Sequence, residues 1–219
     1  MDKITDVTIK PIEGPSKYIR PLRIHFKQDG KPRIWDTMKN HDSVAAVVHN
    51  ISRDVLLFVQ QFRPAVYINR STLQTNGNTS IIDPETNPGS WGLTLELCAG
   101  IVDKDASVAE IMKEEILEEL GYDVPMENIS KITSFRSGGC SVGISGALQT
   151  LFYAEVTDEM KTGPGGGNAH EAERIHTVEY PAKECLKLVY DDSIQRPGGF
   201  LFGLLWFDDN ILKKERLMK

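Results

Sequence analysis

One short segment, a predicted helix crowded with carboxylates, constrains this chain more than any other. Residues 100–122 read GIVDKDASVAEIMKEEILEELGY. Ser107 and Glu110 form an S-x-x-E capping box, which predicts a helix that begins at Val108. Gly121 suits the left-handed position just past the end of that helix. The segment therefore predicts a helix of about three and a half turns.

The carboxylates gather in the last two turns of this predicted helix. They are Glu114, Glu115, Glu118 and Glu119. Like charges four residues apart on a helix repel each other, so an isolated helix would not favour this arrangement. A positive partner among these side chains would relieve the repulsion, and a hard divalent cation with oxygen ligands is the simplest one.

A helical projection separates two kinds of glutamate. Advancing about 100° per residue from Val108 places the apolar residues on one arc, from roughly 40° to 120°. They are Ala109, Met112, Ile116 and Leu120. Glu119 and Glu115 fall at the edge of this arc, at roughly 20° and 340°, whereas Glu110 and Glu114 point away. An ordinary solvated face explains the second pair. A carboxylate beside apolar side chains costs free energy unless it is paired or metal-bound, although a short helix tilted at the surface would also relieve that cost.

The segment resembles the Nudix box, G-x5-E-x7-R-E-U-x-E-E-x-G-U, in which U is a bulky apolar residue. The matching residues are Gly100, Glu115, Ile116, Glu118, Glu119, Gly121 and Tyr122. Two positions depart from the box: Ala106 replaces its first glutamate, and Glu114 replaces its arginine, with Lys113 one residue earlier. In the family that arginine helps to hold a glutamate of the catalytic helix, so its loss bears on the rate more than on the fold.

The resemblance extends over nearly the whole chain. The segments YIRPLRIHFKQDGKPRIWDTMKNHDSV, VQQFRPAVY, LELCAG, QTLFYAEVTDEM and GPGGG look like the uridine diphosphate glucose pyrophosphatase branch of the Nudix hydrolases, close to the ADP-ribose pyrophosphatases. The resemblance implies an α+β fold, a Nudix α/β/α sandwich with a mixed sheet. It also implies a small N-terminal antiparallel β-subdomain over residues 1–42, which serves dimerisation, ahead of a hydrolase domain over residues 43–219.

The implied activity is magnesium-dependent cleavage of nucleotide sugars at the pyrophosphate by a homodimer, with Mn²⁺ as a substitute for Mg²⁺. UDP-glucose would give UMP and glucose 1-phosphate. ADP-ribose as the main substrate is an alternative. A catalytically impaired Nudix-fold module that binds nucleotides is another, motivated by Ala106 and Glu114. The intact E-x-x-E-E cluster speaks against the impaired module, because a purely structural helix has no reason to keep that repulsion.

Composition narrows the class of partner. The formal net charge of −6 disfavours binding of a nucleic-acid polymer, which needs a basic face. A small anionic substrate remains compatible, because bound magnesium would locally reverse the sign. The N-terminal MDKITDVTIK has no apolar leader segment, and the longest apolar run, residues 200–207, is too short to span a membrane. Cys98, Cys140 and Cys185 are widely spaced and odd in number, which indicates a reducing compartment. We therefore expect a cytoplasmic protein that does not associate with membranes.

Local patterns predict the order of the elements. Strands are expected over residues 18–26, 33–38, 44–49, 55–62, 93–98, 129–135, 148–156 and 175–180, with helices over 108–120, 182–189 and, amphipathic, over 200–214. Asp29-Gly30 suits a hairpin turn. Residues 70–90 are rich in Asn, Thr, Pro and Gly, which predicts a long irregular insertion. Strands first, then a helix, then mixed elements indicate an α+β sandwich.

The acidic helix supplies the candidate metal ligands. Glu115 and Glu119, one turn apart, can point at one Mg²⁺ ion, and Glu118 can reach a second. The resemblance adds the backbone carbonyl of Ala99. A divalent ion lowers the pKa of bound water and neutralises a diphosphate, which otherwise repels a nucleophile.

A glycine-rich stretch, residues 163–167, precedes two further acids. It lacks the Gly-Lys-Ser/Thr ending of a phosphate loop, and freedom of motion is its expected role. It leads to Glu171 and Glu173, on a segment that would suit closure over a substrate. By resemblance to ADP-ribose pyrophosphatases, Glu171 would be the catalytic base and Glu173 a metal ligand, and the two roles could be exchanged. A disordered polar loop is the alternative.

Two more residues are candidates for substrate binding. Arg63 follows a predicted strand, where its guanidinium could fork onto a phosphate or form a surface ion pair. Trp35 could stack on a base, although tryptophan is more often part of a core or an interface. Relatives carry Ser-Arg where this chain has Ala147-Leu148, which bears on the preferred nucleotide and sugar.

Overall fold

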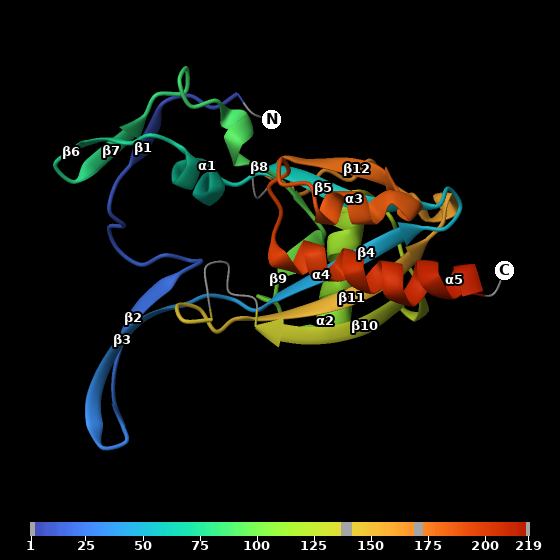
Figure 1. Ribbon diagram of the computed structural model, residues 1–219, viewed down its shortest axis with the longest axis horizontal. Helices are drawn as coiled ribbons and strands as arrows, with labels where there is room; N and C mark the ends of the chain where they lie inside the picture. The colour runs from blue at the N-terminus through green and yellow to red at the C-terminus, as the bar shows by residue number, and fades with distance from the viewer. Residues whose placement is uncertain (1–2, 137–141, 169–172, 218–219) are drawn as a thin grey trace.

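A mixed sheet between two layers of helices forms the body of the protein (Figure 1). The computed structural model describes residues 3–136, 142–168 and 173–217. Within these residues the sheet has seven strands in the order β10-β11-β4-β5-β12, with β8 paired to β5 and β9 paired to β4. The strands are β4 (Ser43–Asn50), β5 (Val55–Phe62), β8 (Leu93–Glu96), β9 (Cys98–Ile101), β10 (Ile129–Arg136), β11 (Leu148–Val156) and β12 (Ile175–Pro181). The β11–β4 pair is parallel and the other pairs are antiparallel.

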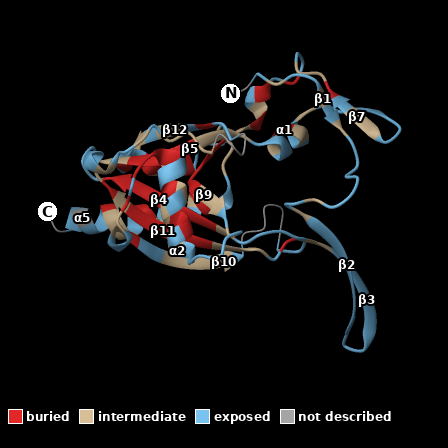
Figure 2. Cartoon of the chain, turned by 180° about the vertical axis from the view of Figure 1, so that it is seen from behind, coloured by how far each residue is buried: buried red, intermediate tan, exposed pale blue. Residues whose placement is uncertain are grey.

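The central strand β4 has both faces covered. Residues 44–48 are at most 3% exposed, which is typical of a strand between two layers. Val44 and its same-face neighbours pack against α2 (Val108–Glu115), whereas Val47 packs against α3 (Cys185–Val189) and α4 (Gly198–Phe207). Figure 2 shows this buried core. The expected α/β/α sandwich with a mixed sheet is therefore confirmed.

The acidic helix has the predicted start and end. Ser107 caps α2 with the expected capping box, and Gly121 adopts a left-handed φ of 79°. The last turn, Ile116–Leu120, is a π-helix. Short π-helical turns are rare and often lie at functional sites. They shift the side chains that follow from their α-helical positions, so this turn affects the direction of the last two glutamates.

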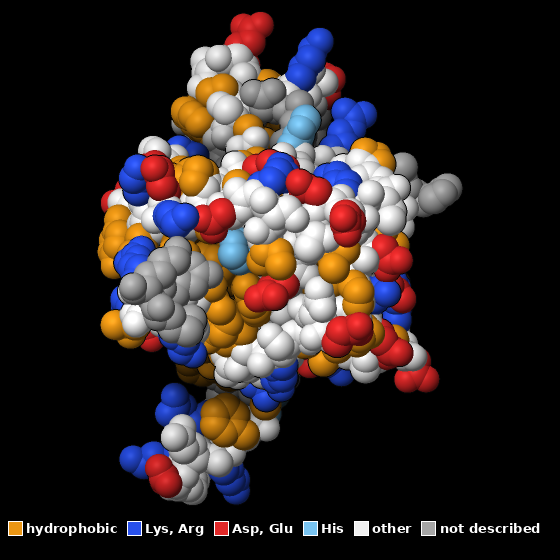
Figure 3. All heavy atoms as spheres, turned by 90° about the vertical axis from the view of Figure 1, so that its right-hand side faces the viewer, with side chains coloured by type: hydrophobic (Ala, Val, Ile, Leu, Met, Phe, Trp, Pro, Cys, Tyr) orange, Lys and Arg blue, Asp and Glu red, His pale blue; other side chains and the backbone are white. Residues whose placement is uncertain are grey.

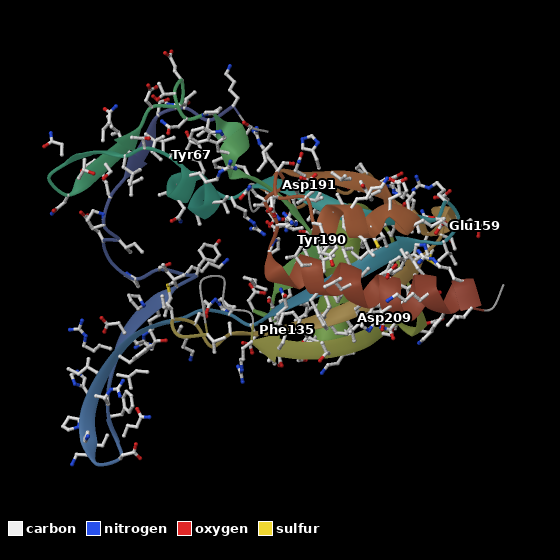
Figure 4. All side chains as sticks on the ribbon, viewed as in Figure 1. Tyr67, Phe135, Glu159, Tyr190, Asp191 and Asp209 are labelled. Atoms are coloured by element: carbon white, nitrogen blue, oxygen red, sulfur yellow. The ribbon has the colours of Figure 1, made fainter. Side chains whose placement is uncertain are left out.

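The insertion is more ordered than the sequence indicated. Within residues 70–90 lie β6 (Gln74–Asn76) and β7 (Thr79–Ile82); α1 (Pro64–Arg70) precedes them, and the 3-10 helix η1 (Gly89–Gly92) follows at the end of the insertion. Strand β1 (Val7–Ile9) pairs with β7, which makes a separate three-stranded sheet with β6. Tyr67, labelled in Figure 4, is 1% exposed and donates its hydroxyl to the carbonyl of Asn87 at 2.6 Å, so it ties α1 to the insertion. The expected irregular loop was wrong because this long-range pairing satisfies the backbone.

The N-terminal hairpin projects from the body (Figures 1 and 2). Among the described strands, β2 (Arg20–Gln28) and β3 (Lys31–Lys39) pair only with each other, and Asp29 and Gly30 turn the chain with φ of 52° and 75°. Five of its large apolar side chains are 37–60% exposed: Leu22, Ile24, Phe26, Ile34 and Trp35. Figure 3 shows hydrophobic side chains among Lys and Arg on this projection, at the bottom of the view. Residues 1–42 thus contribute to two separate sheets, and their role as one dimerisation subdomain stays a prediction.

The C-terminal helix is apolar on more than one face. It comprises α4, the π-helical η7 (Asp208–Leu212) and α5 (Lys213–Leu217). In α4, Phe202 and Leu205 are 42% and 44% exposed. The expectation of a simple amphipathic helix was therefore wrong for α4; the Phe202 ring packs beside that of Phe135, 5.6 Å away between centroids. No helix among the described residues has the length and apolar character needed to cross a membrane.

Candidate active site

A pocket of about 580 Å³ lies where the acidic helix meets β5 and β9. It brings together most of the residues that the sequence singled out, from four separate stretches of the chain. They are Arg63, Ala99, Glu115, Glu118, Glu119 and Glu173. The predicted metal ligands and one predicted phosphate-binding residue therefore share one cavity.

Glu119 lies deepest of the helix glutamates in this pocket. It is 3% exposed, and one carboxylate oxygen accepts a hydrogen bond from the backbone N–H of Ala99 at 3.0 Å. Burial raises the pKa of Glu119 to about 8, with the charges of Glu115 and Glu173 acting in the same direction. Hydrogen bonds from Cys98 and Ala99 act against this rise. A buried carboxyl with a raised pKa is typical of a functional site.

Gly100 makes room for the carboxylate of Glu115. A Cβ atom on Gly100 would lie 2.0 Å from Oε1 of Glu115 and 2.1 Å from its Cδ, distances that atoms do not tolerate. Any larger residue at position 100 would therefore force the Glu115 side chain to shift. Glu118, in contrast, is exposed at the mouth of the pocket.

The glycine-rich loop closes the end of the acidic helix. The backbone N–H groups of Gly166 and Gly167 donate to the carbonyls of Glu119 and Glu118, at 2.9 and 3.1 Å. Gly165 has φ of 70°, and a Cβ atom there would lie 2.4 Å from the carbonyl oxygen of Glu119. The expectation of freedom of motion was therefore wrong for Gly165, where close packing against the helix end leaves no room for a side chain.

The second group of acids is only partly described. Glu173 lines the pocket, and its carboxylate accepts a hydrogen bond from the backbone N–H of Asn168 at 3.1 Å. Glu171, the other candidate base, lies outside the described residues. Its assignment therefore stays a prediction.

Arg63 forms a bidentate ion pair at one side of the pocket. Its Nε and Nη2 donate to the two carboxylate oxygens of Glu96, each at 2.8 Å. The Thr94 hydroxyl also donates to Glu96, at 2.5 Å. Burial acts to raise the pKa of Glu96, but the Arg63 guanidinium and the Thr94 hydroxyl hold it below its usual value. The two guanidinium nitrogens of Arg63 that could bind a phosphate in bidentate fashion therefore bind Glu96 instead.

Trp35 lies outside the pocket of its own chain. It is 47% exposed on β3, and its indole N–H donates to the carbonyl of Gly143 at 2.5 Å. Thr37 and Met38 both donate to the carbonyl of Ile144, at 2.6 and 2.8 Å, which fixes the base of the hairpin. The structure therefore does not bring Trp35 to the glutamates within one protomer.

Sequence reasoning missed three charged residues of the pocket, Glu96, Asp103 and Lys104. Glu96 carried a usable signal, because it is the one charged residue of its strand and charged residues are rarely buried without a partner. Asp103 and Lys104 carried no such signal. They are two of several charged residues in one loop, and only the fold shows that this loop lines the pocket.

The donor set suits a hard cation, although it is not a closed metal site. Carboxylates and a backbone carbonyl are the oxygen ligands that magnesium prefers, and burial, together with the charges of Glu115 and Glu173, raises the pKa of Glu119. Among the described residues, no group of three or more His, Cys, Asp or Glu is placed so that it could hold a metal ion. The arrangement can neutralise and orient an anionic substrate once cations join the acids.

Comparisons with known proteins place these features in a family. No family model matches the chain. It is 39% identical over 215 residues to the uridine diphosphate glucose pyrophosphatase NUDT14 of Bos taurus, covering 94% of this chain and 95% of that protein. The Mus musculus protein of the same name is 36% identical over 220 residues, with 97% of each chain covered. A GDP-mannose pyrophosphatase of Klebsiella pneumoniae is 30% identical over 155 residues, 70% of this chain and 65% of that protein.

A solved structure shares the fold. The crystal structure of an ADP compounds hydrolase superposes with a TM-score of 0.62 and 14% identity, covering 96% of this chain and 94% of that one. The two NUDT14 relatives span both the N-terminal hairpin and the pocket, so the similarity is not confined to the acidic helix. With the helix glutamates gathered in one pocket, these matches show that the chain belongs to the Nudix hydrolases, in the branch of the uridine diphosphate glucose pyrophosphatases.

Proposed function

We propose that this protein hydrolyses the pyrophosphate bond of nucleotide sugars, with UDP-glucose as the main substrate and UMP and glucose 1-phosphate as products. The observation that carries the proposal is the buried Glu119 carboxyl, with its raised pKa, in a pocket shared with three other candidate glutamates. The names of the NUDT14 relatives support the choice of nucleotide and sugar.

Glu115, Glu118, Glu119 and Glu173, with the carbonyl of Ala99, would hold Mg²⁺, or Mn²⁺ in its place. The oxygen donors and the raised pKa of Glu119 support this assignment. When bound, the ions neutralise phosphate charge and lower the pKa of water. Cation binding would also relieve the repulsion within the acidic helix.

Side chains of the protein then accept the proton from water and orient the substrate. Glu171 or Glu173 accepts a proton from the attacking water, whose oxygen bonds to one phosphorus as the bridging P–O bond breaks. Arg63 keeps one terminal nitrogen, Nη1, beyond its two bonds to Glu96. That N–H group can donate to a phosphate oxygen while Glu96 holds the guanidinium plane in place.

We also propose a homodimer built on the N-terminal hairpin. A two-stranded hairpin is marginal on its own in water, and this one leaves five large apolar side chains exposed. A second copy would cover them. Because Trp35 does not line its own pocket, its proposed stacking on the substrate requires the pocket of the partner copy.

A cytoplasmic location completes the proposal. Cys98 and Cys185 are free and buried in the described part of the chain, which suits a reducing compartment.

A nucleotide panel tests the activity directly. The purified protein is incubated with UDP-glucose, GDP-mannose or ADP-ribose, with Mg²⁺ or with a chelator, and nucleoside monophosphate is measured. We expect Mg²⁺-dependent release with the highest kcat/KM for UDP-glucose. A higher kcat/KM for ADP-ribose would make that nucleotide the main substrate. No release from any of them would favour a nucleotide-binding module instead.

A further inference from the structure

The charges that line the pocket are strongly unbalanced. Six of its described residues are acidic: Glu96, Asp103, Glu115, Glu118, Glu119 and Glu173. Two are basic, Arg63 and Lys104. The Arg63 guanidinium is largely committed to Glu96. A diphosphate that enters the pocket therefore meets one further side-chain cation among the described lining residues, the ammonium of Lys104.

Lys104 is held at the pocket from outside. It lies in the loop between β9 and α2, and its Nζ donates to a carboxylate oxygen of Glu114 at 2.7 Å. Glu114 projects from the outer side of α2 and does not line the pocket. The hydrogen bond to Glu114 raises the pKa of Lys104, and the charges of Glu118 and Glu115 add to this. The ammonium therefore lies within the field of two candidate metal ligands.

This ion pair contributes little to the fold. The side chains of Lys104 and Glu114 are 50% and 49% exposed, and ion pairs in water stabilise folded proteins only weakly. An ammonium on a flexible stem can exchange such a partner for an oxygen of the diphosphate, which as a whole carries two negative charges against one on the carboxylate. The position of Lys104 at the pocket thus has a use that stability does not explain.

We propose that Lys104 binds a phosphate of the nucleotide substrate, and that Glu114 holds its ammonium beside the pocket until the substrate arrives. This rests on the proposed function, in which the pocket takes a nucleoside diphosphate. The residue would bind substrate and transition state alike, so its loss should raise KM more than it lowers kcat.

The chain offers a matched control. Lys113 lies on α2 and pairs with Asp123 at 2.9 Å, but it does not line the pocket. We expect Lys104→Gln to lower kcat/KM for UDP-glucose by about ten- to a hundredfold, the cost of one hydrogen bond to a charged group. The melting temperature should stay unchanged. Lys104→Arg should recover most of the activity, and Lys113→Gln should retain all of it. A Lys104→Gln enzyme with wild-type KM would overturn the proposal.

A binding measurement separates this proposal from the proposed function. Calorimetric titration with UDP in the presence of Mg²⁺ reports phosphate binding without turnover. If the wild type binds UDP more tightly than Lys104→Gln but cleaves no nucleotide sugar, the proposed function fails and the role of Lys104 stands. If UDP-glucose is cleaved and both proteins bind UDP equally, the role of Lys104 fails alone.

Discussion

The backbone N–H of Gly166 donates to the carbonyl oxygen of Glu119 at 2.9 Å, so the glycine-rich loop is fastened to the end of the acidic helix. Gly166 also accepts a hydrogen bond from the N–H of Ile175, the first residue of β12. The loop thus joins the helix glutamates to the segment that carries Glu173. A shift of the end of the acidic helix should therefore also change the position of the segment that carries Glu173.

Gly165→Ala should lower both stability and kcat. The added Cβ would lie 2.4 Å from the carbonyl oxygen of Glu119, at a φ of 70° that alanine adopts poorly. Gly163→Ala is the control, because a Cβ there has nothing within 4 Å. Thermal denaturation and steady-state kinetics of the two variants should differ clearly. Equal behaviour would mean that the loop packs loosely in solution.

Glu119→Gln should lower kcat by orders of magnitude while the melting temperature holds or rises. The amide keeps the shape of the side chain but removes a charge that burial disfavours. Kinetics with Mg²⁺ and calorimetric denaturation check the two parts separately. An unchanged kcat would remove this glutamate from the chemistry, and a large drop in melting temperature would show that its charge stabilises the fold.

Because of Glu119, the free energy of unfolding of the metal-free protein should decrease as the pH rises from about 4.5 to about 8. The pKa of Glu119 is raised on folding, so in this range the folded state keeps a proton that the unfolded state has lost, and ionisation costs stability. The difference between the melting temperature of Glu119→Gln and that of the wild type should therefore shift in favour of the variant as the pH rises. Added Mg²⁺ should narrow this gap, since binding to the ionised folded form stabilises it. A gap independent of both pH and Mg²⁺ would contradict the assignment.

Arg63→Gln should lower stability by about 1–3 kcal/mol, because it leaves the buried Glu96 carboxylate without its ionic partner. Adding Glu96→Gln should recover part of that loss. The pKa of Glu96 is lowered on folding, so its contribution is present at neutral pH and disappears as the pH falls through the folded-state pKa. Denaturant titrations of the wild type, the two single variants and the double variant, near pH 7 and in acid, measure the coupling between the two residues. Additive losses would show that the pair does not act as a unit.

Mixed dimers should show whether Trp35 serves the partner's pocket. Trp35→Ala removes the stacking ring, and Glu119→Gln inactivates the pocket, so each pure protein should turn over slowly. A mixed dimer would hold one pocket with intact glutamates and a tryptophan from the other copy. Co-refolding the two proteins should therefore raise activity above the sum of the separate samples. No rise in a sample shown by mass to contain mixed dimers would exclude this role.

Local chemistry made much of this molecule predictable. The capping box of Ser107 fixed the start of α2, and the strands over 55–62 and 148–156 matched their predicted limits because each holds a short run of large apolar residues of strand length. The position of Glu119 beside apolar side chains followed from helical geometry alone. These features depend on residues within one or two turns of each other.

Most of the contacts that the sequence did not predict join residues far apart in the chain. The Arg63 fork meets Glu96, 33 residues away, and no local pattern announces that contact. The Gly166 N–H reaches a helix more than forty residues earlier in the chain, which a Gly-rich composition does not reveal. Helix α1 was missed although Pro64 at its first turn is a usual start signal. For Arg63 and Gly166 the partner is set by how the fold brings distant segments together, whereas the signal for α1 is local.

The pairing of β1 with β7 has a practical consequence for handling the protein. Val7–Ile9 cover one edge of a small sheet that residues from the insertion complete. A shortened protein that lacks the first ten residues would present the bare edge of β7 to its neighbours, and such edges recruit strands from other molecules. Trimmed preparations should therefore precipitate more readily than whole ones, even though none of the described residues 3–10 lines the pocket.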